Sequence, residues 1–342
     1  METLDDDFSN ILMIFSLFPS SNLNIKDIYN ISDLNLNKEL LLLSKKGWLI
    51  YIDKETYKIH QIIKEFLLYN FPLRCEHVVP MIKNNLKCIR WNEVEHPKNQ
   101  QRYMTFAKSL IDGLSNSDDG LIMLSNNLAM LYRYFGYFEL ALKYMIIVKE
   151  YDENTGDKVS LAQTYNNLGQ VYSSMKNSKL AKKYNLLSLN IRKEHSSYNI
   201  QENYLSICDN AIREENYIEA KEYLDKLLSM KTDIKSIIPI YNSAILYYLN
   251  IKDIDKAFIY VNKALDKINN GEVDSKHLYI AYTYSNISEI YIANNNLDLA
   301  IEYRLKAKEH ILKNFGDTHP DLEYINKALT TLVDINKMNN IF

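Results

Sequence analysis

The sequence predicts a mainly α-helical chain, in which a small N-terminal module is followed by a solenoid of stacked helix pairs. Glycine and proline are scarce, 8 and 6 among 342 residues, and turn-rich β folds need more of both. Beyond residue 120, one pattern of two helices and a tight polar turn recurs five times, as in repeat solenoids. Alternating residues near position 50 add a short hairpin.

Charge and composition argue against several classes of partner. The net charge of −3 and the pI of 6.2 give no basic surface for nucleic acid or acidic membranes. The longest apolar run, residues 11–18, is too short to span a bilayer, and it follows acidic residues where a signal peptide would be basic. Cys75, Cys88 and Cys208 are too few and too widely spaced for a disulfide framework. We therefore expect a cytoplasmic protein with no membrane partner.

Residues 1–73 contain the elements of a winged helix in the expected order. Three helices are predicted over residues 8–18, 24–30 and 37–47, the last ended by Gly47. The alternating segments "WLIYID" and "ETYKIH" flank the turn-forming Asp53 and Lys54, which indicates a hairpin. A fourth helix, "QIIKEFLLYN", ends before Pro72.

The charge of this module makes DNA an unfavourable partner. Residues 1–73 hold ten Asp and Glu against seven Lys. A DNA-binding protein neutralises phosphates with Lys and Arg, so this balance favours packing against protein.

Three segments of the module, "LFPSSNLNIKDIY", "LLSKKGWLIYID" and "YKIHQIIKEF", resemble the winged-helix domain of the signal-transduction ATPases with numerous domains, the STAND or NB-ARC group. In that family a Met-His-Asp-like triplet places its histidine against the β-phosphate of bound ADP. The triplet here is Ile59-His60-Gln61, so the resemblance implies that His60 senses a nucleotide phosphate, although Gln61 replaces the acid.

The nucleotide-binding part of that family has no counterpart in the sequence. A Gly-x-x-x-x-Gly-Lys-Ser/Thr loop would hold the phosphates, and none occurs. His60 therefore has two interpretations. It is either a partly buried histidine that a backbone carbonyl satisfies, or a sensor that needs an ATPase domain from a longer chain or from a partner.

Residues 74–120 are predicted to be a helical connector or a degenerate first repeat. Helical periodicity runs through "EHVVPMIKNNLKCIRW" and "NQQRYMTFAKSLIDGL", with the loop "NEVEHPK" between them. Ala107 falls 34 residues before Ala141, the first alanine of the repeat pattern.

The five repeats share an alanine that opens the second helix, at Ala141, Ala181, Ala220, Ala257 and Ala300. Small residues let the paired helices approach closely, and tyrosines fill the layer between neighbours. The small positions are Ala129, Gly169, Cys208 and Ser288, and the tyrosines are Tyr132, Tyr172, Tyr248 and Tyr291.

This pattern resembles the long tetratricopeptide repeats of kinesin light chains. In "FGDTHPDLEYINKAL", Gly316 and the pair His319-Pro320 match the loop between repeats of that subclass. The resemblance implies a repeat array over residues 121–342, closed by a capping helix over residues 321–336. It implies a binding scaffold and no particular ligand.

In tetratricopeptide arrays the first helices line a groove, and side-chain amides there hydrogen-bond the backbone of an extended peptide. We expect such a groove to bind a protein or a peptide here. Its side chains should come from positions that recur on one face of the first helices: Asn127, Met130, Arg133, Asn167, Gln170, Ser173, Ser206, Asp209, Ile212, Ser243, Leu246, Leu249, Asn286 and Glu289. The lysine-rich clamp of chaperone-binding arrays is missing from these positions.

We find no sequence pattern for catalysis, a metal or a cofactor. Cys75, His77, Cys88 and His96 do not have the spacing of a zinc site. No nucleophile elbow or Gly-rich oxyanion turn accompanies any Cys or Ser. The sequence therefore predicts a non-enzymatic protein.

Three functions remain open. The leading hypothesis is a sensor or scaffold that forms the ligand-recognition half of a STAND-type ATPase, or a partner of one, with a nucleotide-binding domain contacting the winged helix. One alternative is a winged-helix transcriptional regulator controlled by a peptide in the groove. The other is a plain adaptor with no switch.

Overall fold

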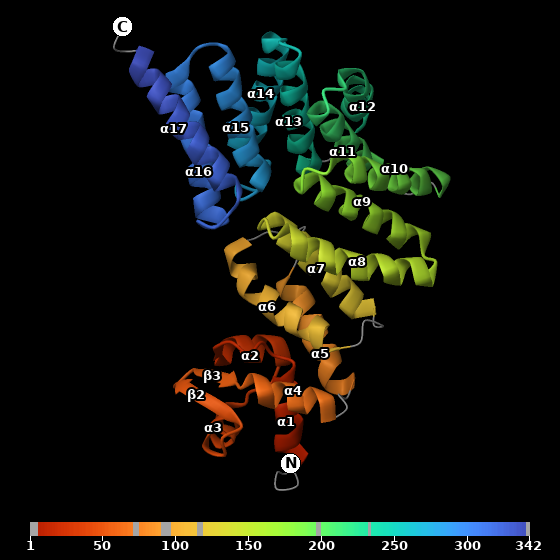
Figure 1. Ribbon diagram of the computed structural model, residues 1–342, viewed down its shortest axis with the longest axis vertical. Helices are drawn as coiled ribbons and strands as arrows, with labels where there is room; N and C mark the ends of the chain where they lie inside the picture. The colour runs from red at the N-terminus through yellow and green to blue at the C-terminus, as the bar shows by residue number, and fades with distance from the viewer. Residues whose placement is uncertain are drawn as a thin grey trace. The chain divides into compact units, whose positions relative to one another are not determined.

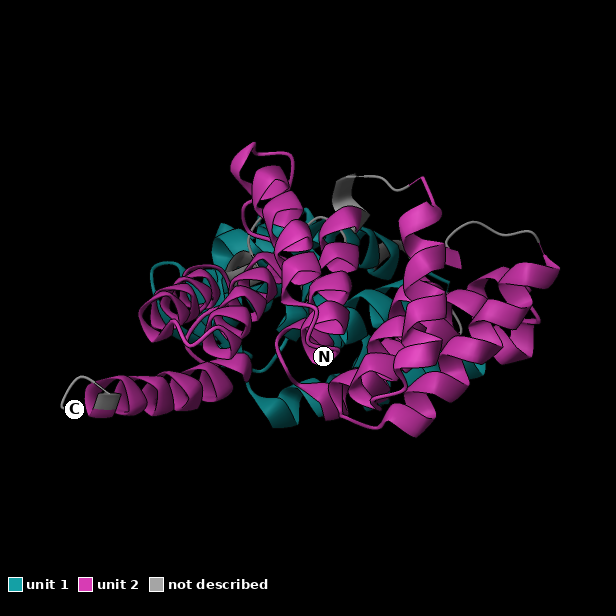
Figure 2. Cartoon of the chain, turned by 90° about the horizontal axis from the view of Figure 1, so that it is seen from above, with its two compact units in different colours: residues 1–93, 99–131, 143–151 teal, residues 94–98, 132–142, 152–342 magenta. Residues whose placement is uncertain are grey.

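The structure is a computed structural model that describes residues 6–70, 75–89, 97–114, 119–195, 200–231 and 234–339. These residues form 17 α-helices and three short β-strands (Figure 1), so the predicted fold class, a mainly α chain with an α-solenoid, is confirmed. The chain divides into two compact units (Figure 2): unit 1, residues 1–93, 99–131 and 143–151, and unit 2, residues 94–98, 132–142 and 152–342. No helix in the described ranges combines the length and the apolar character needed to cross a membrane.

The N-terminal module has the expected three helices, hairpin and fourth helix, and one additional strand. Its elements are α1 Asp6–Ser16, β1 Leu23–Asn24, α2 Ile25–Ser32, α3 Asn37–Lys45, β2 Leu49–Asp53, β3 Thr56–Ile59 and α4 Gln61–Asn70. The sheet is antiparallel with the order β1-β3-β2. The sequence did not predict β1, because two residues are too short to show any alternation.

The core of this module contains α1, which is buried on all sides from Ile11 to Ser16, and one face of α3. Phe15 and Phe18 are fully buried and pack edge to face, with ring centroids 5.3 Å apart. In α3, Leu40 and Leu43 are buried because residues three apart share one helix face. Leu41, between them, stays 43% exposed.

Two further helices of unit 1, α5 Cys75–Cys88 and α6 Pro97–Gly113, occupy the predicted connector. Most of the predicted loop "NEVEHPK" lies outside the described residues. The Lys64 ammonium of α4 donates to the Phe18 carbonyl oxygen at 2.6 Å and also hydrogen-bonds the Ser109 hydroxyl of α6. Burial lowers the pKa of Lys64 to about 8.

The array consists of five helix pairs and a last single helix, α17. The first and second helices of the pairs are α7 Asp119–Tyr134 and α8 Phe138–Thr155, α9 Lys158–Ser174 and α10 Ser178–Glu194, α11 Ile200–Arg213 and α12 Tyr217–Ser229, α13 Ile234–Asn250 and α14 Ile254–Asn269, and α15 Leu278–Ala293 and α16 Leu297–Asn314; α17 spans Asp321–Asn339.

The tight turns of the second to fifth pairs have the same chemistry. A left-handed residue ends the first helix, with φ between 56° and 63° at Lys176, Glu215, Lys252 and Asn295. An Asn or Asp then caps the second helix; the Asn177 side chain, for example, accepts from the Leu180 N–H. In the first pair the left-handed residue is Gly136, at φ 80°. This turn positions the alanine that opens each second helix.

Contacts within the pairs explain the small residues and the tyrosines. The five repeat alanines are all 0% exposed. The small side chains of Cys208 and Ser288 hydrogen-bond the carbonyl oxygens of Ala220 and Ala300. Tyrosines twelve residues apart stack across the pair, with centroids 5.5 Å apart for Tyr172–Tyr184, 5.6 Å for Tyr248–Tyr260 and 5.7 Å for Tyr291–Tyr303.

Candidate functional site

The predicted groove positions lie on the first helices of the five pairs, and they differ in how far they are buried. Met130 and Asn167 are 0% exposed, Ser243 is 2% and Asn286 is 8% exposed. Met130 therefore packs in the core of its pair. Ile212 is buried as well, at 6% exposure. The half-buried positions, whose side chains still reach solvent, are Asn127, Arg133, Gln170, Ser173, Ser206, Asp209, Leu246, Leu249 and Glu289.

The three asparagines at equivalent positions have different partners. The Asn127 side-chain N–H donates to the Ile89 carbonyl oxygen at 3.1 Å, within unit 1. The Asn167 Oδ1 accepts from the Gln163 side-chain N–H at 3.0 Å. The buried Nδ2 of Asn286 has no hydrogen-bond partner among the described residues. Of the three side chains, Asn286 is thus the one with a buried N–H group that no described residue satisfies.

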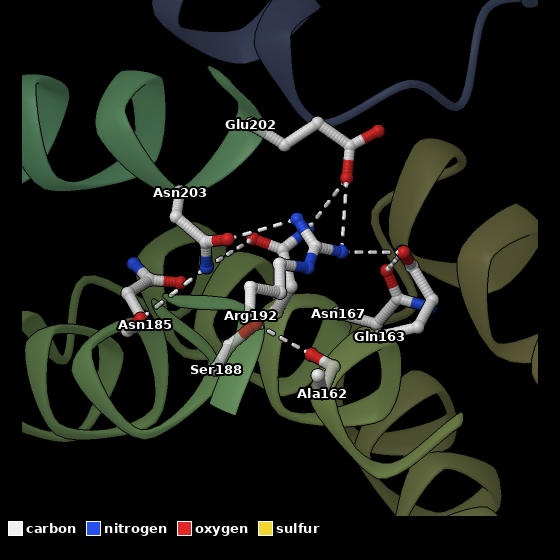
Figure 3. Close-up of polar contacts among 9 residues, drawn as sticks. Ala162, Gln163, Asn167, Asn185, Ser188, Arg192, Glu202 and Asn203 are labelled. Atoms are coloured by element: carbon white, nitrogen blue, oxygen red, sulfur yellow. Dashed lines mark hydrogen bonds and ion pairs between the residues drawn. The ribbon is translucent and has the colours of Figure 1, made fainter. Parts of the chain in front are cut away.

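Next to Asn167 lies a buried polar cluster that the sequence did not predict (Figure 3). The guanidinium of Arg192, only 3% exposed, donates to Asn203 Oδ1 at 2.8 Å and to Gln163 Oε1 at 2.6 Å. The Glu202 carboxylate lies 3.6 Å from the same guanidinium. Burial raises the pKa of the Glu202 carboxyl, and the positive charge of Arg192 lowers it in part. The Glu202 side chain is 41% exposed, so the carboxylate lies at the solvent edge of the cluster. The cluster joins α9, α10 and α11.

Other polar contacts connect neighbouring first helices. The Ser243 hydroxyl on α13 donates to the Asp209 carboxylate on α11. The Arg213 guanidinium on α11 donates to the Ser173 hydroxyl on α9. Burial raises the pKa of Asp209, whereas Arg213 and the Ser243 hydrogen bond lower it. At the last pair, Glu289 forms an ion pair with Arg304, a residue only 1% exposed.

Within unit 2, the turn between α7 and α8 packs against the loop between α16 and α17. The His319 Nε2 lies 2.9 Å from the Tyr134 carbonyl oxygen, and the Tyr134 and Phe315 rings are 5.7 Å apart. A Cβ built on Gly136 would lie 2.2 Å from Pro320 Cγ, so the turn needs glycine here for space as well as for its φ. The predicted loop residues His319 and Pro320 are therefore contact residues.

This packing places Arg133 near two tyrosines of α15. Arg133 lowers the pKa of both Tyr279 and Tyr282, while burial raises both pKa values more strongly. Sequence analysis missed these tyrosines. They lie seven and four residues before Asn286, so extending the groove face of α15 toward its N-terminus would have found them.

His60 is exposed, so the interpretation as a partly buried histidine held by a carbonyl is wrong. Its Nδ1 accepts from the Ile62 N–H at 3.2 Å at the start of α4. This bond assigns the ring proton to Nε2, which leaves an N–H donor facing solvent.

Apolar side chains near His60 are exposed as well. The exposed fractions are 41% for Ile50, 46% for Ile52, 69% for Ile62 and 50% for Phe66. Ile50 and Ile52 belong to β2, and Ile62 and Phe66 belong to α4, so both elements that flank β3 and His60 carry exposed apolar side chains.

No group of three or more His, Cys, Asp or Glu that could hold a metal occurs in the part of the chain that the structure describes. The side chains of Cys75 and His77, and all of His96, lie outside that part.

Comparisons with known proteins bear on the array. A tetratricopeptide repeat family model matches residues 121–194. Among curated proteins, none matches the sequence of this chain.

Solved structures share the fold at low sequence identity. The apo form of RapI has a TM-score of 0.52 at 16% identity, over 70% of this chain and 94% of its own. A tetratricopeptide repeat protein from Parabacteroides merdae has a TM-score of 0.51 at 17% identity, over 75% of this chain and 93% of its own. The array is thus an α-solenoid of the tetratricopeptide type.

A STAND protein with a tetratricopeptide repeat sensor, from Pyrococcus horikoshii, matches 96% of this chain and 53% of its own, with 17% identity and a TM-score of 0.45. This chain therefore spans about half the length of that protein.

Proposed function

We propose that this chain is a non-enzymatic recognition scaffold whose repeat array binds a protein or peptide ligand along the groove face of its first helices. The N-terminal module is a winged helix that packs on a nucleotide-binding domain. Together they are the ligand-recognition half of a STAND-type signalling ATPase, or a partner of one.

The observation that carries the ligand-binding part is the unpaired polar chemistry on the first helices. Asn286 Nδ2 and Arg133 Nε are buried and have no hydrogen-bond partner among the described residues. Buried polar groups are almost always hydrogen-bonded, so an unpaired donor on a first helix is a group that a ligand can complete. Gln170 and Ser206 lie half-buried on the same face and add amide and hydroxyl groups.

The N-terminal part of the proposal rests on the resemblance around Ile59-His60-Gln61 and on the exposed surface beside it. A free Nε2–H suits a phosphate oxygen, and the apolar side chains of Ile52, Ile62 and Phe66 suit a protein surface. A salt titration of DNA binding tests this part. Retention of DNA that weakens steeply as salt rises would overturn it in favour of the transcriptional regulator.

The ligand-binding part is tested by affinity selection of a random synthetic peptide library on the immobilised full chain. We expect a family of related sequences to be enriched, and their affinity, measured by fluorescence anisotropy, to fall at least roughly tenfold in Gln170→Ala/Asn286→Ala. The matched control is Asn250→Ala, because the Asn250 amide bonds only the Leu246 carbonyl of its own helix. Enrichment of no sequence family, or equal losses in both variants, would contradict the proposal.

A further inference from the structure

Of the four arginines in unit 2, three have a carboxylate partner. Arg192 pairs with Glu202 at 3.6 Å, and Arg304 pairs with Glu289. The positive charge of Arg213 acts on the Asp209 carboxyl. Arg133 forms no ion pair with any described residue, although Asp274 lies within electrostatic reach of the neighbouring Tyr134.

The surroundings of Arg133 add hydroxyl donors to its guanidinium. Its Nε is buried without a partner, and the guanidinium carbon lies 5.9 Å from the centroid of the Tyr134 ring. The hydroxyls of Tyr279 and Tyr282 form no hydrogen bond within the described residues, and both side chains are only half-buried. Tyr134 and Tyr282 pack against the same buried cluster, and the Tyr279 and Tyr282 rings are 5.7 Å apart. The guanidinium beside Tyr134 therefore lies in the same region as the two phenols.

These groups meet because of the contact between the α7–α8 turn and the α16–α17 loop. Gly136 against Pro320, and the His319 ring on the Tyr134 carbonyl, hold the end of α7 beside the start of α15. Arg133 and Tyr279 therefore come from the first and fifth pairs. A ligand group that contacts both would therefore bridge these two pairs.

We propose that Arg133, with the hydroxyls of Tyr279 and Tyr282, binds a single carboxylate of the peptide ligand; this inference rests on the proposed function. A guanidinium presents paired N–H donors that match a carboxylate, and phenols donate to the same oxygens. The Asp209 and Glu202 carboxylates act on Tyr279, with the Arg213 cation opposing them, and the Asp321 carboxylate acts on Tyr282. These carboxylates repel a second acidic group. The ligand therefore carries one acidic group flanked by neutral or basic residues.

The test repeats the library selection with wild type and Arg133→Gln, using the library as C-terminal acids and as C-terminal amides. We expect wild type to enrich peptides with one acidic group and Arg133→Gln to lose that preference. Enrichment in both library forms identifies a side-chain Asp or Glu, and enrichment among the acids alone identifies the terminal carboxylate. For a selected peptide, affinity should fall at least roughly tenfold when either Arg133 or the peptide acid is neutralised, with little further loss when both are.

Two further variants separate charge from folding. Arg133→Lys should keep most of the acid preference, since it keeps the charge and loses only the planar fork. Arg102→Gln, on an arginine of α6 that lies near Asp27, is the matched control and should change nothing. Far-UV circular dichroism confirms folding. If peptides are selected without any acidic preference, or if Arg133→Gln keeps the preference, the carboxylate site is wrong while the groove stands; if nothing is selected, the proposed function fails first.

Discussion

Two interfaces between neighbouring helices of unit 2 are built from opposite chemistry. The interface of α9, α10 and α11 has a buried arginine at its centre, with Asn203 and Gln163 as hydrogen-bond acceptors. Its remaining bonds include one from Asn203 Nδ2 to Asn166 Oδ1 at 3.3 Å. The interface of α11, α12, α13 and α14 has an apolar core, with Leu224, Ala244 and Ile245 all 0% exposed, and the Ser243–Asp209 hydrogen bond lies beside it.

The difference teaches that the repeat pattern fixes the spacing of the helices but leaves the interior chemistry open. Alanine, the small residue and the turn recur at both interfaces, and between them either amides or aliphatic side chains fill the space. Polar networks tolerate less change, because each removed partner leaves another group buried and unpaired. Apolar packing depends mainly on volume.

The largest expected change in stability comes from placing a methionine in each of the two interfaces, at Arg192 in the polar one and at Leu224 in the apolar one. Arg192→Met should lower the free energy of unfolding by about 3 kcal/mol, because Asn203 Oδ1 and Gln163 Oε1 lose their donor in a buried site. Leu224→Met should cost less than about 1.5 kcal/mol, since it nearly conserves volume. Denaturant melts combined with hydrogen exchange in α9 to α11 and in α11 to α14 measure the two effects locally.

Equal losses in the two variants would show that the amides pair with water or with one another once the arginine is gone. Arg102→Met, on the surface of unit 1, is the control for removing an arginine from a helix and should stay within about 0.5 kcal/mol of wild type.

The sequence predicted the apolar interface far better than the polar one. Ala220, Ala257 and the capped turns follow from local spacing, and so do the helices that they join. Arg192 stands in "NIRKEH" beside Lys193, where it resembles a solvated helix residue. Its partners are 11 and 29 residues away, so only the folded array brings them together. The same holds for Arg133, whose charge acts on Tyr279 of the last pair because the His319–Tyr134 contact joins the two ends of the array.

The same limit applied to the groove positions. The periodicity placed Met130 and Asn286 on first helices, where the structure has them. Periodicity cannot tell a buried position from a half-buried one when a neighbouring pair covers part of the face. For His60, the interpretation as a partly buried histidine failed because its exposure follows from its place between the end of β3 and the start of α4, and its apolar neighbours in sequence do not show this.

A smaller effect is expected where the polar interface meets the small position of α9. A Cβ on Gly169 would lie 2.0 Å from Asn185 Oδ1 and 2.6 Å from its Cγ, and Asn185 is 0% exposed. Gly169→Ala should therefore destabilise by about 1–2 kcal/mol, although alanine favours a helix more than glycine does. Adding Asn185→Ser should recover most of the loss, because the shorter side chain frees the space. A thermal melt of the three proteins measures this, and a stable single variant would mean that the amide moves aside at no cost.

The smallest effect concerns the pH dependence of stability that arises from Asp152, a buried carboxyl of α8 that contacts α9. It is 5% exposed and accepts from the Thr164 hydroxyl at 2.6 Å. Burial raises its pKa above the usual 3.8, with the Thr164 hydrogen bond opposing. The proton therefore favours the folded state, and the stability from this group is fully present below pH 3.8 and is lost as pH rises through the folded pKa. Asp152→Asn keeps the Thr164 hydrogen bond and should be more stable than wild type at neutral pH.

Asp157, five residues along, is the matched control with the opposite sign. Its carboxylate caps α9 by accepting from the Val159 and Ser160 N–H groups and from the Ser160 hydroxyl, and these bonds lower its pKa. Its stabilisation is present above pH 3.8 and is lost as pH falls through the folded pKa, so Asp157→Asn should be less stable than wild type at neutral pH. Urea melts at acid and neutral pH compare the two variants. If the two variants change the free energy of unfolding in opposite directions at neutral pH, burial governs Asp152 and helix capping governs Asp157. If both change it in the same direction, Asp152 is hydrated in the folded protein.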